Sequence, residues 1–162
     1  MCGREMQQRT QGLMMFLGAL ADGLEEVVGQ GAVATCFTAG RMAGMKPHSC
    51  NKEVDDRSNV REILLAVRSE MECRGINWPF DIDYHNIIEP ESDHSQGWII
   101  PFQNCTARCT LFRYGFPQGR ALCQTKHGLF CGLFKRISGQ QVSLEILHAG
   151  ENACLLRLKL FT

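Results

Sequence analysis

The sequence lacks an excess of charge of either sign, because 17 Lys and Arg residues balance 17 Asp and Glu residues. Binding to a nucleic-acid backbone calls for a basic surface, so a general role of that kind is not expected. Long hydrophobic runs are missing as well. The longest, Leu13 to Ala21, has nine residues, whereas a helix that spans a bilayer needs about 20. We therefore expect no transmembrane segment, although peripheral association with a membrane or a larger complex is compatible with this sequence.

Motifs for common cofactors are missing too. Neither a P-loop nor a G-x-G-x-x-G motif occurs, so nothing indicates a nucleotide, nicotinamide or flavin cofactor. The first residues, Met1 to Glu5, are polar, and no small-residue cleavage site follows an apolar stretch. We therefore expect no secretory leader and a cytoplasmic location.

Cysteine, in contrast, is abundant, with nine residues. An odd number cannot all pair within one chain. In a reducing compartment, clustered cysteines more often bind metal or take part in redox chemistry than form structural disulfides. We expect Cys36, Cys50 and Cys73 to be core or surface thiols.

The chain has 162 residues, of which 44% are hydrophobic and 21% charged. This composition is typical of a soluble globular protein, and we interpret residues 1–162 as a single domain. A domain of this size buries about 68–70% of the surface that its unfolded chain exposes. It is therefore large enough to enclose a pocket.

The first part of the chain has the periodicity of amphipathic helices. Apolar residues recur at three- and four-residue steps from Leu13 to Val28, and Gly40 and Gly44, one turn apart, permit close helix packing. Asn59 and Glu62 resemble a capping box. The predicted helices are 6–28, 32–45, one from Ser58 or Asn59 to Gly75, and 120–137.

Alternating apolar residues predict strands in the second part of the chain. The predicted strands are 78–84, 96–104 with a break at Pro101, 141–147 and 154–161, while 105–116 is ambiguous. The fold class that follows is α+β. We expect N-terminal helices packed on a small, mostly antiparallel sheet, with a further helix before a C-terminal β-hairpin.

Five aromatic residues from the sheet and the following segments are candidates to line an apolar ligand pocket. Such pockets combine converging apolar side chains with a few orienting polar groups. The alternative is that the same residues fill an ordinary core. The candidates are Trp98, Phe102, Phe112, Phe130 and Phe134.

Residues of the last helix and hairpin have types and spacings that suit a zinc ion. Zinc accepts a mixed set of thiolate, imidazole and carboxylate ligands, here Cys123, Glu145, His148 and Cys154. The alternative is that the two cysteines are small buried hydrophobes. Cys105-x3-Cys109 is a second candidate for metal or redox chemistry, or two cysteines on one face of a short helix.

The same C-terminal residues resemble the signature of the 4-vinyl-reductase domain, a small-molecule-binding module. Two stretches are similar to that family's pattern: Cys123-x4-Gly128, and Glu145-x2-His148 followed by a Gly-containing turn and Cys154. Two positions differ from the pattern, because His148 stands where Cys is usual and Leu129 replaces an aromatic residue. The resemblance implies that Cys123, Glu145, His148 and Cys154 hold zinc beside a pocket for an aromatic ligand. It also implies the fold shared with subunits of the TRAPP tethering complex.

Three functional hypotheses follow, since a shared fold does not select a function. The first is a module that binds an apolar or aromatic small molecule, which the resemblance extends to tetrapyrrole-like ligands. The second is a dimeric interaction or assembly factor, for example for pigment–protein complexes. The third, a reductase, is disfavoured by the missing cofactor motifs. We also expect a homodimer, because a monomer would leave the apolar first helices under-covered and because Gly40 and Gly44 offer a close-packing face.

Overall fold

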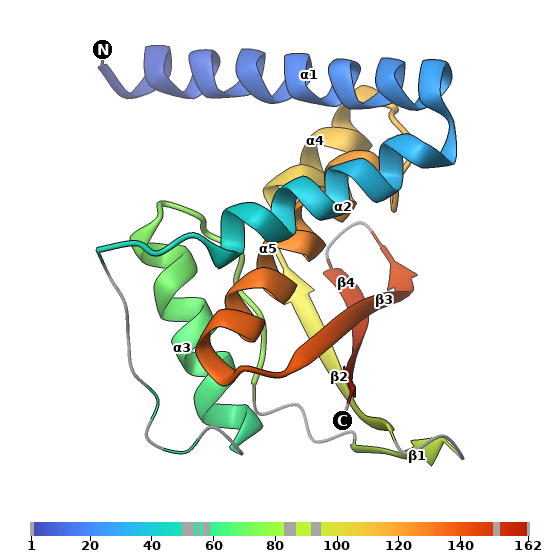
Figure 1. Cartoon of the computed structure of the whole chain (residues 1–162). Coiled ribbons are helices and arrows are strands. Elements are labelled where there is room, and N and C mark those ends of the chain that lie inside the picture. Colours follow the sequence, from blue (N-terminus) through green and yellow to red (C-terminus); the bar gives the residue numbers. More distant parts are fainter. Residues whose placement is uncertain are drawn as a thin grey trace.

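The computed structural model describes residues 2–49, 54, 56, 59–82, 87–91, 95–150 and 153–161. Its helices and strands follow one another as shown in Figure 1, and their packing confirms the predicted α+β class. The elements are α1 (Cys2–Val28), α2 (Gln30–Met45), α3 (Val60–Cys73), β1 (Ile87–Glu91), β2 (Ser95–Gln103), α4 (Thr106–Tyr114), α5 (Ala121–Ser138), β3 (Gln141–Ala149) and β4 (Ala153–Phe161).

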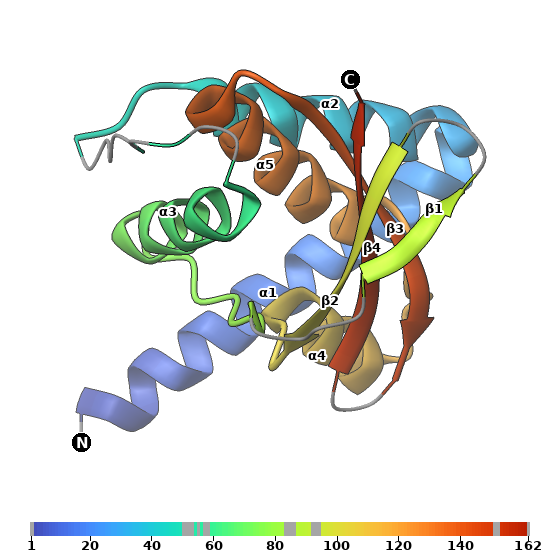
Figure 2. The ribbon, with the colours of Figure 1, turned by 90° about the horizontal axis from the view of Figure 1, so that it is seen from below.

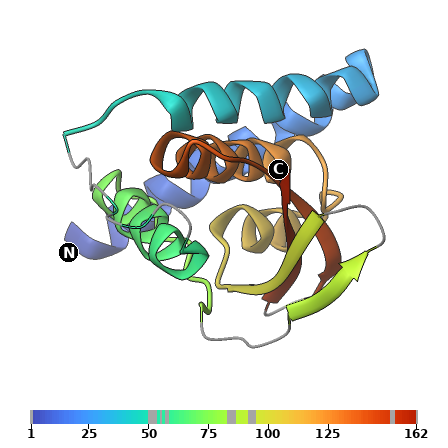
Figure 3. The ribbon, with the colours of Figure 1, turned by 60° about the horizontal axis from the view of Figure 1, so that its bottom comes forward.

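The four described strands form one antiparallel sheet in the order β1-β2-β4-β3. Because successive side chains of a strand point to opposite faces, Phe102, Leu144 and Leu156 share the inner face and are buried. Helix α5 covers this face, and α3 lies beside it (Figures 2 and 3). The predicted C-terminal hairpin is confirmed as β3 and β4, with a bulge between Ile146 and His148.

Helices α2 and α5 cross at very short range, because glycines of each face the backbone of the other. A Cβ atom on Gly40 would meet the carbonyl oxygen of Thr125, and one on Gly128 would meet the carbonyl oxygen of Phe37. Gly44 also faces α5. The small residues of α2 therefore serve packing within the chain, and Gly40 and Gly44 cannot form the dimer face for which the sequence made them candidates.

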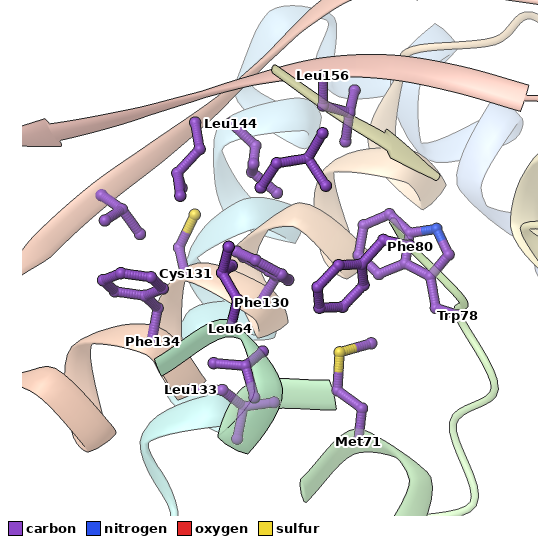
Figure 4. Packing of buried hydrophobic residues seen from close by; sticks show 14 of the residues in the cluster. Leu64, Met71, Trp78, Phe80, Phe130, Cys131, Leu133, Phe134, Leu144 and Leu156 are labelled. Atoms are coloured by element: carbon purple, nitrogen blue, oxygen red, sulfur yellow. The ribbon is translucent and has the colours of Figure 1, made fainter. Parts of the chain in front are cut away.

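Helix α3 begins where the sequence predicts. The side chain of Asn59 accepts hydrogen bonds from the amides of Arg61 and Glu62, and it donates to the carboxylate of Glu62. This reciprocal pairing satisfies backbone donors that a helix start leaves unpaired. Leu64 and Met71 of α3 then pack on Phe130 and Leu133 of α5 in the core (Figure 4).

Three segments differ from the sequence prediction. Residues 78–82 are not a strand: Phe80 makes only an isolated bridge to Phe102, and residues 83–84 lie outside the described part. Strand β2 continues through Pro101, which lies beyond the part of β2 that pairs with β1 and whose carbonyl accepts a hydrogen bond from the amide of Asp81. The ambiguous segment 105–116 forms α4.

Helix α1 packs through a different face from the one that its periodicity suggests. Gly18 lies against the ring of Phe116, whereas Leu13, Phe16 and Leu20 are each about 60% exposed. The first turns extend beyond the other elements (Figures 1 and 2). None of the helices in the described part of the chain combines the length and hydrophobicity that a bilayer span requires.

Candidate functional site

The interior between the sheet and α5 is lined by aromatic rings in mutual contact (Figure 4). The ring centroids of Trp78 and Phe102 are 4.2 Å apart, and those of Phe80 and Phe102 are 5.0 Å apart. Phe130 stands edge-on to both Phe80 and Phe102 and continues to Phe134. Such tilted and edge-to-face arrangements are the favourable ones for aromatic pairs, so these rings form a stable aromatic wall.

Two ring nitrogens at the edge of this wall are buried without a hydrogen-bond partner in the described part of the chain. They are Nε1 of Trp78 and Nδ1 of His127. The two rings are stacked, with centroids 5.9 Å apart and planes 7° apart. Burial, reinforced by the charge of Lys126, lowers the pKa of His127 to about 4. The imidazole is therefore neutral at physiological pH. One of its ring nitrogens can donate a hydrogen bond and the other can accept one.

The structure brings together three of the five aromatic residues that the sequence proposed. Phe102, Phe130 and Phe134 are fully buried and lie in one cluster. Trp98 is half-buried and packs at the edge of that cluster. Phe112, which lies on the outer side of α4, is 54% exposed and does not join them. The proposed convergence is therefore wrong for Phe112, because its helix presents Leu111 to the interior instead.

A cavity of about 560 Å³ lies elsewhere, at the turn between α1 and α2. Its lining includes Glu25, Val33 and Arg120. The Arg120 guanidinium is 3.5 Å from the Glu25 carboxylate, which also accepts a hydrogen bond from the amide of Ala121. None of the five proposed aromatic residues lines this cavity.

The four proposed metal ligands lie on helix α5 and on both faces of the sheet. Cys123 is buried on α5, and Cys154 is half-buried on the inner face of β4. Glu145 is exposed on the outer face, where its carboxylate lies 3.4 Å from both Arg157 and Lys159. His148 is exposed as well. Across the described ranges, no three His, Cys, Asp or Glu side chains are grouped so that they could hold a metal ion. The structure therefore does not bring the four proposed ligands together around one point.

The reason is the pleat of the strand. Val142, Leu144 and Ile146 of β3 point inward, so Glu145 points outward. Burial raises the pKa of Cys123 to about 11 and also raises the pKa of Cys154. Burial therefore favours the neutral thiol form of both side chains.

Other cysteines differ in environment. Cys105 is the N-cap residue of α4, and the ammonium group of Lys126 lies 3.2 Å from its sulfur. Cys109, one turn later, is exposed, and Cys36 is half-buried. Cys73 is disulfide-bonded, which corrects the expectation of a free thiol there. Cys50 lies outside the described residues.

Sequence reasoning missed the contributions of Trp78 and His127. The sequence places Trp78 in the predicted strand 78–84 and His127 in the predicted helix 120–137, and it indicates no role for either side chain. A local signal was present, because His127 directly precedes the apolar run 128–134 of this helix. Trp78 and His127 are far apart in the chain, so only tertiary packing brings their rings together.

Comparisons with known proteins support the fold. No model of a known protein family matches the sequence, and no curated protein matches it. Among solved structures, the fold is similar to the phenol-responsive sensory domain of the transcription activator PoxR, crystallised with phenol, with a TM-score of 0.53. The two share 13% sequence identity, and the match covers 90% of this chain and 73% of that one. The chain thus has the fold of a known small-molecule-binding sensory domain.

Proposed function

We propose that this chain is a small-molecule-binding module whose ligand is an aromatic compound that carries a polar group. The fold is that of a sensory domain crystallised with phenol, and the aromatic wall offers apolar surface for a ring. The C-terminal resemblance to the 4-vinyl-reductase domain is consistent with the same class. A tetrapyrrole ligand and a zinc ion remain predictions of that resemblance, and extraction of bound pigment and elemental analysis of protein purified without chelators test them.

The observation that carries the proposal is a pair of buried nitrogens that find no hydrogen-bond partner among the described residues, Trp78 Nε1 and His127 Nδ1. A buried polar group that lacks a hydrogen bond costs roughly 1–3 kcal/mol. A single hydroxyl group of a ligand can accept a hydrogen bond from the Trp78 N–H and donate one to Nδ1 of His127. Binding such a ligand therefore relieves two penalties at once, while its ring gains contact with the aromatic wall.

Tryptophan fluorescence tests this proposal directly, because the chain has only two tryptophans. Trp98→Phe leaves Trp78 as the single reporter, and Trp78→Phe leaves Trp98. We expect phenol to change the fluorescence of the Trp98→Phe protein strongly and that of the Trp78→Phe protein weakly. His127→Phe should weaken phenol binding about tenfold, because a hydrogen bond of roughly 1–1.5 kcal/mol is lost.

Calorimetric titration of the wild-type chain provides the decisive control. Toluene has the ring of phenol without its hydroxyl, so it should bind more weakly than phenol. If neither compound binds at millimolar concentration, the module does not take small aromatic ligands. Equal affinity for both would show that the two nitrogens do not recognise a hydroxyl.

A dimeric interaction module is the second candidate, favoured by the exposed apolar face of α1. Leu13, Phe16, Leu20 and Val27 share this face and lie mostly in solvent. Contiguous exposed apolar surface on a helix is typical of a protein–protein contact. We propose that two copies of the chain associate through α1, an arrangement that is compatible with ligand binding in the interior.

A further inference from the structure

Arg108, in the first turn of α4, is a buried cation that has only neutral partners in the described part of the chain. The residue is 1% exposed. Its Nη1 donates to the carbonyl of Gly150, and its Nη2 lies 3.8 Å from the sulfur of Cys109. Its Nε is buried and meets no acceptor among the described residues. A guanidinium stays charged at any physiological pH, and burying a charge without a counter-charge is costly.

Another part of the same molecule shows how a buried arginine is normally compensated. The carboxylate of Glu70, itself buried, lies 2.5 Å from Arg136 and 2.8 Å from Arg74. There the positive charge is paired with a negative charge supplied by the chain. Around Arg108, in contrast, no carboxylate of the described residues lies within ion-pair distance, so within this part of the chain its charge is not paired with a negative charge.

A second cation lies at the start of the same helix. The ammonium group of Lys126, half-buried on α5, is 3.2 Å from the sulfur of Cys105 and 4.5 Å from the centroid of the Trp78 ring. It too has no carboxylate partner in the described part of the chain. Cys105 is the N-cap of α4, and its side chain makes no capping hydrogen bond. The free amides of a helix start carry partial positive charge and favour anions.

We propose that Arg108, Lys126 and the first turn of α4 bind an anion, the carboxylate of a small aromatic acid whose ring lies toward Trp78. This inference rests on the proposed function and specifies its ligand class. Arg108 and Lys126 supply the charge, and Lys126 joins the two regions because it contacts both the α4 cap and the Trp78 ring. Arginine suits this role because its planar group matches the geometry of a carboxylate.

Calorimetric titration of the full chain with benzoate, phenol and acetate tests the proposal. We expect benzoate to bind at least about tenfold more tightly than phenol, because a hydrogen bond to a charged group contributes roughly 1.5–3 kcal/mol. Acetate has the carboxylate without the ring and should bind far more weakly than benzoate. Added salt should weaken benzoate binding and leave phenol binding nearly unchanged.

Two variants and one control assign the effect to the cations. Arg108→Gln should lower the affinity for benzoate about 10- to 100-fold and change that for phenol by less than about threefold. Lys126→Gln, at a half-buried position that is safer for folding, should lower benzoate affinity in the same direction. Arg113→Gln removes an exposed charge from the same helix and should leave benzoate affinity unchanged.

The outcomes separate this inference from the proposed function. If phenol binds and benzoate binds no more tightly, the anion site is wrong and the binding module stands. If no aromatic compound binds, both are wrong. If elemental analysis finds a metal ion that Cys123→Ser or Cys154→Ser removes, metal-bound thiolates provide the counter-charge and the anion site is overturned.

Discussion

Gly128 of α5 lies directly against the backbone carbonyl of Phe37 of α2. The contact is possible only because Gly128 has no side chain, and Gly40 makes the reciprocal contact with Thr125. This crossing fixes the position of α5. Helix α5 in turn carries Lys126, His127 and Phe130, so the geometry of the candidate site depends on glycine positions where a methyl group does not fit.

Gly128→Ala should therefore lower the free energy of unfolding, by about 1–3 kcal/mol or more, because the added methyl group must push two helix backbones apart. Gly23→Ala is the matched control, since no atom lies within 4 Å of the Cβ that it adds. The control should be stabilising by up to about 1 kcal/mol through helix propensity. Chemical denaturation of both proteins measures this. Two changes of the same sign and size would contradict the close crossing.

Glu70 should make stability depend on acid pH. Burial acts to raise the pKa of Glu70, but hydrogen bonds and charge interactions with Arg136 and Arg74 outweigh it and hold the pKa below the ordinary value of 4.5. A group whose pKa is lower in the folded state contributes stability above its unfolded pKa, and this contribution is lost as pH falls through the folded pKa. The stabilising effect of Glu70 should thus be complete at neutral pH.

Glu70→Gln should cost about 3 kcal/mol at neutral pH, because it removes the buried carboxylate that pairs with Arg74 and Arg136. The difference from wild type should shrink as the pH is lowered below about 4.5. Glu72→Gln, at an exposed position of the same helix, should have little effect at any pH. Thermal unfolding over a pH series provides the measurement, and a pH-independent difference would be evidence against the ion-pair role.

The thiols should differ sharply in reactivity. Burial raises the pKa of Cys131 to about 12, so the reactive thiolate is scarce and the sulfur is shielded. Cys109 is exposed and should be alkylated by iodoacetamide well before Cys131. Mass spectrometry of partially labelled native protein gives the order, and denatured protein, in which both should react alike, is the control. Early labelling of Cys131 would mean that the α5 core opens readily.

The exposed face of α1 should mediate self-association. We expect wild-type protein to sediment as a dimer at micromolar concentration and the double variant Phe16→Glu, Leu20→Glu to sediment as a monomer, because paired carboxylates repel each other and cannot be buried cheaply. Met42→Glu places the same charge at an exposed methionine of α2 and should leave the dimer intact. A wild-type monomer would remove α1 as a dimer face.

Local signals in the sequence were sufficient for much of the fold. Helix α5 and the β3–β4 hairpin follow from periodicity and a glycine-containing turn, and the start of α3 follows from Asn59, because a cap is completed within three residues. Features that depend on neighbours were not predictable. Pro101 lies in β2 beyond the part that pairs with β1, which ends at Trp98, and residues 78–82 meet β2 only through the single bridge from Phe80 to Phe102.

In the candidate site, too, some features follow from local sequence and others depend on tertiary contacts. Residue type and spacing singled out Cys123 and Cys154 as candidate ligands, with buried thiols as the alternative, and Phe102, Phe130 and Phe134 as candidates to line a pocket or fill a core. Tertiary structure decided that Glu145 faces away from Cys123, since one residue of strand register exchanges the faces of a sheet. It also decided that Trp78 meets His127 and that Arg108 lies buried without a carboxylate in the described part of the chain. Those relationships join segments distant in sequence, and only the packing of α4 and α5 against the sheet creates them.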